Sequence, residues 1–239
     1  MKRVTCFCLF TFALFAVGCQ KEQKKLEVSP TEIAVYSEGT QQITTNVEDA
    51  QFSSQDDFYA SVESSGLVTG NKVGTTEILV SSSNGTARIP VTVLNKYSLY
   101  PDLDGLIGKG LSDFTKLLGS DYSTSTTTSG EPMYGFSNPS TYASLIACTI
   151  SGNKCSSIVV AVPTTYTSML TKHLVERYTV AGTQNGYYFF LNHDKKVVIT
   201  LYVYSASLLA VLYMENTSSK SSEAIDFSVL QELSSLSFE

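Results

Sequence analysis

The chain has no tryptophan, 2 histidines and few basic residues. Lys and Arg number 16 against 22 Asp and Glu, which gives a formal net charge of −6 at pH 7. A nucleic-acid binder needs a basic surface that displaces counterions from phosphates, and this charge balance runs the other way. No glycine-rich phosphate loop precedes a helix in a βαβ pattern. The sequence therefore predicts neither nucleic-acid nor nucleotide binding.

Catalytic and metal-binding motifs are equally scarce. His173 falls on a predicted helix and His193 in a turn, and no Gly-x-Ser-x-Gly elbow marks a nucleophile. The acidic pairs, Asp56-Asp57 and Asp102 with Asp104, lack the spacing of an EF-hand calcium loop. We expect a non-enzyme with no catalytic residue, no metal site and no cofactor, in which both histidines and these carboxylates face solvent.

The longest apolar run is too short to span a membrane. Lys2 and Arg3 precede the apolar stretch 4–17, which falls short of the roughly 20 residues of a spanning helix. A positively charged N-terminus, a short apolar segment and a small residue before the cleavage site predict a signal peptide over residues 1–18.

Phe15-Ala16-Val17-Gly18-Cys19 resembles the bacterial lipobox, in which the leader is cut before a cysteine that receives acyl chains. The resemblance implies that Cys19 is the first mature residue, carries diacylglycerol and palmitate, and anchors the protein stably in a membrane. Residues 19–25 then form a lipidated tether. Because Gln20 is not the aspartate that retains lipoproteins at an inner membrane, we expect an outer-membrane lipoprotein facing the periplasm or the cell surface. The alternative is an ordinary secretory leader with an incidental Cys19.

Two cysteines remain in the folded part. Cys148 and Cys155 flank a hairpin-like segment with Gly152-Asn153 at its tip, which places them within cross-strand reach. In an oxidising compartment they could form a disulfide. The alternative is two free thiols that serve as small buried apolar residues.

Residues 26–95 alternate between apolar and polar over short runs separated by turns. About seven short strands with no helical period predict a small β-sandwich. The stretch 64–78, with Gly66-Leu67-Val68-Thr69-Gly70 followed by Gly74-Thr75, resembles the bacterial Ig-like group 2 repeat, in which Phe52 replaces the usual tryptophan. The resemblance covers 26–94, and it implies a spacer or adhesion module of bacterial surface proteins without catalytic residues.

Residues 98–239 form a second, α+β domain in which helical and strand periods alternate. A helix ending at Gly119 and a helix opening at Pro163 are each followed by four predicted strands, and the repeated order suggests a tandem repeat, 109–162 and 164–214. Five identities support it: Thr115, Lys116, Leu118, Tyr122 and Gly130 recur as Thr171, Lys172, Leu174, Tyr178 and Gly186. The alternative is a single irregular α+β sheet.

Short turns between the strands predict an antiparallel sheet with both helices on one face. This order is similar to the tandem helix-plus-four-strand folds of β-lactamase inhibitory protein and of small outer-membrane assembly lipoproteins. The fold class is thus mainly β with α+β, an Ig-like sandwich before two α-β-β-β-β units. A last amphipathic helix is predicted over 222–236.

One face of the second sheet is rich in aromatic residues, which combine contact area with a polar tip and suit interfaces and sugar faces. The proposed binding face consists of Tyr187, Phe189, Tyr202, Tyr204 and Tyr213. The alternative is that the C-terminal helix covers it, and a turn of odd length would exchange the two faces.

The sequence therefore predicts a non-catalytic binding or adhesion protein of the cell envelope, held to the membrane by its lipid, whose partner is a protein or a glycan. The Ig-like module is the spacer and the C-terminal domain the binder. The first alternative is an assembly or inhibitor-type protein that captures another protein through its sheet face. The second is an unrecognised hydrolase, which would need a histidine beside a serine or carboxylate in a cleft.

Overall fold

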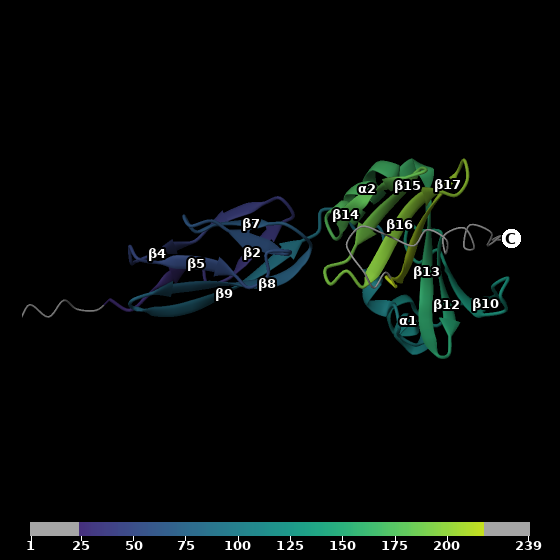
Figure 1. Ribbon diagram of the computed structural model, residues 1–239, viewed down its shortest axis with the longest axis horizontal. Coiled ribbons are helices and arrows are strands. Elements are labelled where there is room, and N and C mark those ends of the chain that lie inside the picture. Colours follow the sequence, from purple (N-terminus) through teal and green to yellow (C-terminus); the bar gives the residue numbers. More distant parts are fainter. Residues whose placement is uncertain (1–23, 218–239) are drawn as a thin grey trace, which may run out of the picture.

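The computed structural model describes residues 24–217. The predicted signal peptide, Cys19 and the helix expected over 222–236 lie outside the described residues. Strands dominate the described part and form a sandwich followed by a second domain built on one large sheet (Figure 1). The predicted mainly β architecture is confirmed.

The sandwich holds nine strands between residues 28 and 94. They are β1 (Val28–Ser29), β2 (Ile33–Tyr36), β3 (Thr40–Gln42), β4 (Thr44–Thr45), β5 (Gln51–Ser54), β6 (Ala60–Val62), β7 (Leu67–Gly70), β8 (Gly74–Ser82) and β9 (Gly85–Leu94). One sheet has the order β2-β9-β8-β5, the facing sheet has the order β3-β7-β6, and β1 pairs with β4. Alternate residues of both sheets point inward, so Ile33, Val68, Ile78 and Ile89 are buried between them.

The glycine turn of the sandwich requires its glycine. Gly66 has a φ of +84°, and a Cβ at this position would lie 2.8 Å from the carbonyl oxygen of Ile43 and 3.0 Å from the ring of Phe52. Only glycine combines this backbone conformation with so close an approach. Phe52 itself packs against the sandwich core, where an aromatic residue is expected.

The second domain contains the predicted order α-β-β-β-β twice. The first unit consists of α1 (Leu111–Leu118), β10 (Ser123–Thr126), β11 (Pro132–Ser137), β12 (Leu145–Ser151) and β13 (Lys154–Pro163). The second consists of α2 (Thr167–Val175), β14 (Thr179–Gln184), β15 (Tyr187–Leu191), β16 (Val197–Val203) and β17 (Leu208–Glu215). Short 3-10 turns, η1 (Asp104–Leu106) and η2 (Thr164–Tyr166), precede the two helices.

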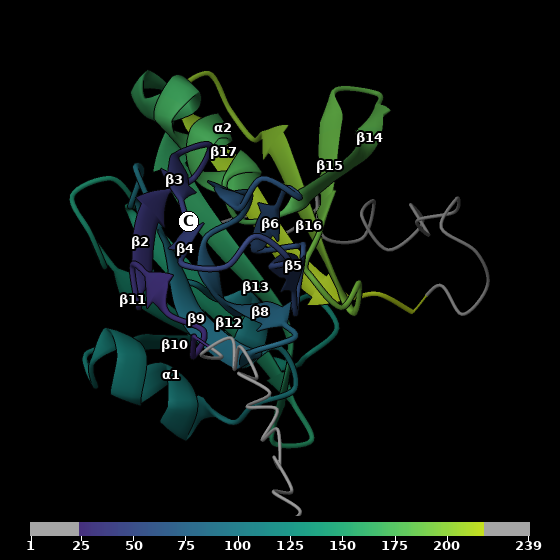
Figure 2. The ribbon, with the colours of Figure 1, turned by 90° about the vertical axis from the view of Figure 1, so that its left-hand side faces the viewer.

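All eight strands form one antiparallel sheet in the order β10-β11-β12-β13-β17-β16-β15-β14. The last strands of the two units, β13 and β17, therefore pair at its centre. Both helices pack on one face, as predicted, because Phe114 of α1 and Leu170 and Leu174 of α2 belong to the same buried cluster as the strand residues of that face. Seen from the sandwich end, the sheet lies behind the sandwich, with α2 near its top and α1 near its bottom (Figure 2). An origin of the two units by duplication stays a prediction.

The opposite face of this sheet carries most of the predicted aromatic residues. The ring of Tyr187 lies 6.4 Å from that of Phe189 and 5.3 Å from that of Tyr202, measured between centroids. Phe189 is only 2% exposed and belongs to a small apolar cluster with Leu212. This face is therefore packed and does not present an open row of rings.

Tyr213 was expected on that face, and the prediction was wrong. The register pairs Tyr202 with Ala210 and Ile199 with Tyr213. The N–H of Tyr204 donates to the carbonyl oxygen of Leu208, so the β16–β17 turn between these two residues has three residues, Ser205 to Ser207. A turn of odd length moves every residue of the second strand to the other face. Tyr213 is consequently fully buried beneath the helices.

The predicted disulfide is not formed either. Cys148 and Cys155 are free and buried, and they are not cross-strand partners, because Cys148 lies opposite Ile158 and Cys155 opposite Ile150. A β-bulge after Thr149 shifts the register between them. The structure matches the alternative, in which two free thiols serve as small buried apolar residues.

Alkylation will report this state of the thiols. Burial raises the pKa of both thiols to about 12, which reduces the thiolate at pH 8 by about 1000-fold relative to an exposed cysteine. We expect iodoacetamide to label Cys148 and Cys155 at least about 100-fold more slowly in the native chain than in guanidinium chloride, as read by peptide mass mapping. Two sulfurs that stay unlabelled after unfolding without reductant would instead reveal a bridge.

Candidate functional site

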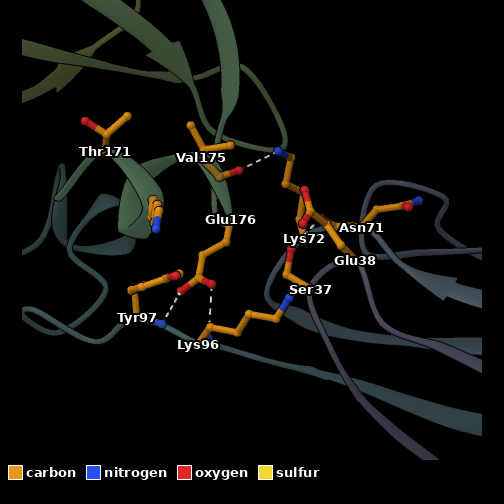
Figure 3. A pocket seen from close by; sticks show the side chains of 10 residues that line it. Ser37, Glu38, Asn71, Lys72, Lys96, Tyr97, Thr171, Val175 and Glu176 are labelled. Carbon is orange, nitrogen blue, oxygen red and sulfur yellow. Dashed lines mark hydrogen bonds between the residues drawn. The ribbon is translucent and has the colours of Figure 1, made fainter. Parts of the chain in front are cut away.

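The two domains meet through hydrogen bonds centred on Glu176, the residue that follows α2. Its carbonyl oxygen accepts the N–H of Val73 at 2.8 Å, which belongs to the sandwich. Its carboxylate accepts the N–H groups of Lys96 (3.0 Å) and Tyr97 (2.9 Å), which lie in the linker after β9 (Figure 3). Lys72 of the sandwich donates from Nζ to the carbonyl oxygen of Val175 at 2.6 Å. We call this set of contacts the domain junction.

Arg177 supports the junction from inside the second domain. Its side chain is 7% exposed and donates to Asp102 at 2.6 Å and to Glu176 at 2.9 Å. It also donates to the carbonyl oxygens of Tyr97 and His173. Glu176 and Arg177 thus form a buried ion pair in which the guanidinium has several acceptors, the arrangement that a buried pair needs to offset its desolvation.

His173 was expected on the surface of its helix, and this expectation was wrong. It is 1% exposed, its Nδ1 lies 3.1 Å from the carbonyl oxygen of Tyr97, and its ring packs on Tyr100. Burial, reinforced by the nearby Arg177 guanidinium, lowers the pKa of His173 to about 4. The imidazole is therefore neutral and structural at pH 7, and not a binding group.

A cleft of about 440 Å³ opens beside the junction (Figure 3). We call it the lysine cleft, because Lys72, Lys96 and Lys172 line it together with Glu38 and Tyr97. The ammonium of Lys172 lies 5.1 Å from the centroid of the Tyr97 ring, a cation–π contact. Burial lowers the pKa of Lys72, while the Glu38 carboxylate acts in the opposite direction.

A second cleft of about 310 Å³ lies between the domains, and we call it the histidine cleft. The rings of Phe58 and Tyr59 lie 4.6 and 5.2 Å from that of His193, so aromatic contacts join a sandwich loop to the β15–β16 turn. His193 Nε2 lies 3.0 Å from Asp56 Oδ2. His193 was expected to be a solvated turn residue, but tertiary contacts engage it although its side chain is still 44% exposed.

The acidic pairs were also expected in solvent, and three of their carboxylates are engaged. Asp56 binds His193, Asp102 binds Arg177, and Asp104 accepts hydrogen bonds from Tyr178 and Asn192. Each of these partners is distant in sequence, so no local pattern indicated them.

The histidine cleft meets the requirement stated for a hydrolase, a histidine beside a serine or a carboxylate. It contains a histidine at hydrogen-bond distance from a carboxylate. Its described lining, however, includes neither serine nor cysteine, and Thr75 is the aliphatic hydroxyl among the lining residues. The pair can relay a proton, but it lacks an adjacent Ser or Cys nucleophile.

Among residues 24–217, no group of three His, Cys, Asp or Glu side chains is arranged to hold a metal ion. Within the same range, no helix has the length and apolar content needed to cross a bilayer. Among residues 24–217 the lysine and histidine clefts are two candidate binding sites, and the sequence predicted neither. Of the predicted aromatic residues, Tyr187, Phe189 and Tyr202 share one face, where Tyr187 and Tyr202 are half-exposed. Tyr204, directly after β16, is 36% exposed.

Comparisons of the whole chain with solved structures give weak likenesses. An extracellular protein with an SCP domain from Bacillus anthracis str. Ames is 14% identical at a TM-score of 0.31, with 52% of this chain and 48% of that chain covered. An intimin mutant from EHEC O157:H7 is 16% identical at a TM-score of 0.25, with 55% of this chain and 90% of that chain covered. A SusE-like surface located polysaccharide binding protein from Bacteroides thetaiotaomicron is 11% identical at a TM-score of 0.22, with 78% of this chain and 34% of that chain covered.

The chain spans about half the length of the first of these structures. At these TM-scores none of the three bears on what this chain does. No curated protein matches the chain.

The N-terminal domain does have a family match. Residues 23–93 match the model of the bacterial Ig-like domain (group 2). The matched residues include all but the end of the described sandwich, with Phe52 against its core and Gly66 in its turn. The first domain of this chain is therefore a bacterial Ig-like domain of group 2, a module that fits a protein of the cell envelope or surface.

Proposed function

We propose that the protein is an envelope lipoprotein in which acylated Cys19 holds the chain to the outer membrane. In this proposal the Ig-like domain is a spacer, and the C-terminal domain binds a protein or a glycan without chemical change. The observation that carries the proposal is the arrangement of the two domains. The described chain begins at one end of the sandwich, at the start of the purple ribbon, and the C-terminal domain is bonded to the opposite end (Figure 1).

This arrangement supports a spacer because the junction restricts domain motion. Backbone and side-chain hydrogen bonds from Lys72, Val73 and Glu176 join the domains directly, and the linker is itself bound by the Glu176 carboxylate. Two domains joined by a free linker reorient, and each of these hydrogen bonds opposes that motion. In the proposal, the contacts of the junction hold the C-terminal domain at the end of the sandwich that lies away from Cys19.

The anchor is tested by replacing Cys19 in the full chain expressed in a bacterium that processes lipoproteins. We expect Cys19→Ala to abolish incorporation of labelled palmitate and to move the protein from the detergent phase to the aqueous phase, because two or three acyl chains supply the membrane affinity. Cys148→Ala is the matched control and should stay acylated. Palmitate on the Cys19→Ala variant would refute the anchor.

The binding role is tested on a glycan array and against intact cell surfaces with the full-length protein in detergent. Retention that persists in a Cys19→Ala variant would support binding by the folded domains, since the anchor then plays no part. Failure to bind any glycan or surface protein would contradict the proposed function.

A hydrolase is the second candidate, favoured by the His193–Asp56 pair in the histidine cleft. It requires turnover of a substrate that His193→Asn abolishes while the thermal midpoint stays unchanged. The inhibitor-type alternative has less support, because Phe189 and Leu212 are buried on the sheet face that would capture a partner.

A further inference from the structure

The lysine cleft concentrates positive charge in an acidic protein. Its three lysines come from separate segments: Lys72 from the turn between β7 and β8, Lys96 from the linker and Lys172 from α2. Within residues 24–217, none of the three ammonium groups forms an ion pair with a carboxylate. The formal charge of the whole chain is −6, so this local excess of cations is not a property of the surface at large.

The carboxylates in the cleft do not neutralise these lysines. Glu176 is bound by Arg177 and by two backbone N–H groups, which leaves Glu38 as the acidic lining residue not already paired with a cation. One of the donors of Lys72 binds the Val175 carbonyl, and the remaining N–H groups are available to a ligand. Three cations facing one carboxylate attract an anionic group.

The shape and lining of the cleft favour a carbohydrate chain over a folded protein. Its volume of about 440 Å³ lies in the range of small-ligand sites, roughly 300–1,000 Å³, whereas a protein partner needs a broad surface of about 800 Å². The partly buried ring of Tyr97 lines the cleft with the Lys172 ammonium over it, so an aromatic ring and a cation lie within reach of the same sugar unit. Charge and ring together match a sugar that carries an acidic group.

We infer that the lysine cleft binds an acidic polysaccharide, with Lys72, Lys96 and Lys172 contacting its carboxylate or sulfate groups and Tyr97 contacting a sugar ring. This inference rests on the proposed binding function and names its site and ligand class. Because the three lysines belong to the sandwich, the linker and the second domain, a bound chain contacts all three. The ligand therefore strengthens the junction as it binds.

The test measures binding of the full-length protein in detergent to polygalacturonate, dextran sulfate and neutral dextran. We expect binding to one or both acidic polymers, none to dextran, and loss of binding on raising NaCl from about 50 to 300 mM, because salt screens exposed charges. Polygalacturonate and dextran sulfate distinguish carboxylate from sulfate as the anionic group. The variant Lys72→Gln/Lys96→Gln/Lys172→Gln should bind at least about tenfold more weakly, because several charge-assisted contacts are lost together.

Two further variants separate the cleft from other effects. Lys109→Gln/Lys154→Gln/Lys195→Gln makes the same change in net charge at exposed positions elsewhere and should bind within about twofold of the wild type. Lys96→Gln/Lys172→Gln keeps the Lys72–Val175 bond but removes the contact of Lys172 with Tyr97, so its thermal midpoint is measured beside its binding. Weaker binding at an unchanged midpoint excludes a loosened junction as the cause.

Equal losses in the cleft and control variants, or equal binding of single-stranded DNA, would overturn the inference in favour of non-specific attraction of polyanions. So would the absence of binding to both acidic polymers. If all three variants still bind a neutral glycan or a surface protein as the wild type does, the lysine cleft is not the binding site. The proposed binding function would then still stand.

Discussion

Replacing Arg177 by methionine will lower the free energy of unfolding by about 3–5 kcal/mol, because the change leaves a buried carboxylate without its cation. The side chain of Glu176 is 6% exposed and depends on Arg177 for its ionic partner. Methionine also removes the donors to the Tyr97 and His173 carbonyl groups. The measurement is denaturant unfolding of the full-length protein in detergent, followed by circular dichroism.

Arg88→Met is the matched control for this change. Arg88 and Glu77 form an ion pair on the sandwich with side chains 59% and 42% exposed, so its loss should cost less than about 1 kcal/mol. The double variant Arg177→Met/Glu176→Gln should recover part of the loss, because no buried charge remains. Comparable small losses at Arg88 and Arg177 would show that the buried pair contributes little.

Raising the pH above 10 will destabilise the protein by about 4 kcal/mol per pH unit through three buried tyrosines. Tyr100 and Tyr213 are hydrogen-bonded through their hydroxyls at 3.0 Å, and the ring of Tyr178 lies 6.1 Å from that of Tyr213. Burial raises the pKa of all three phenols, whereas tyrosines of the unfolded chain titrate near pH 10.

The sign follows from proton counting. Above pH 10 the unfolded chain releases the protons of these three tyrosines, which the native chain keeps, so the unfolding free energy falls as the pH rises. Cys148, Cys155 and Tyr202, whose pKa values burial raises to about 12, add to this fall. The contribution of these groups is complete below pH 10 and is lost between 10 and their raised native pKa values, at about 1.4 kcal/mol per group and pH unit. Tyr213→Phe should reduce the slope by about 1.4 kcal/mol per pH unit, the contribution of one group, and Tyr188→Phe, at a position 51% exposed, should leave the slope unchanged. Identical slopes in all three proteins would show that Tyr213 is not protected.

Local pattern was sufficient to place the strands of the second domain. The structure has four strands after each of the two helices, as predicted, and the helix expected to end at Gly119 does so, with that residue at a φ of +91°. Such features depend on neighbours in the chain. The face on which Tyr213 lies depends on whether the number of residues in the β16–β17 turn is odd or even, so one residue more or less in this turn exchanges the two faces.

The two clefts could not be predicted in the same way, because they depend on which surfaces of two domains meet. In the sequence, Glu176 and Arg177 are an adjacent charged pair after a helix, which is ordinarily a solvated position. Their burial depends on Lys96 and Tyr97, about 80 residues earlier in the chain. A single sequence holds no signal for such long-range pairs, and the same limit applies to His193 and Asp56.

The parallel pairing of β2 with β9 determines how the sandwich bears mechanical load. The chain enters β2 from its N-terminal side and leaves β9 toward the C-terminal domain, and Ile33–Tyr36 pairs with Val91–Leu94 in parallel. Tension between a membrane and a bound ligand would pull these two strands in opposite directions along their length. All hydrogen bonds between them would then be sheared together and not unzipped one at a time, so the sandwich is built to resist stretching along the axis on which it is pulled.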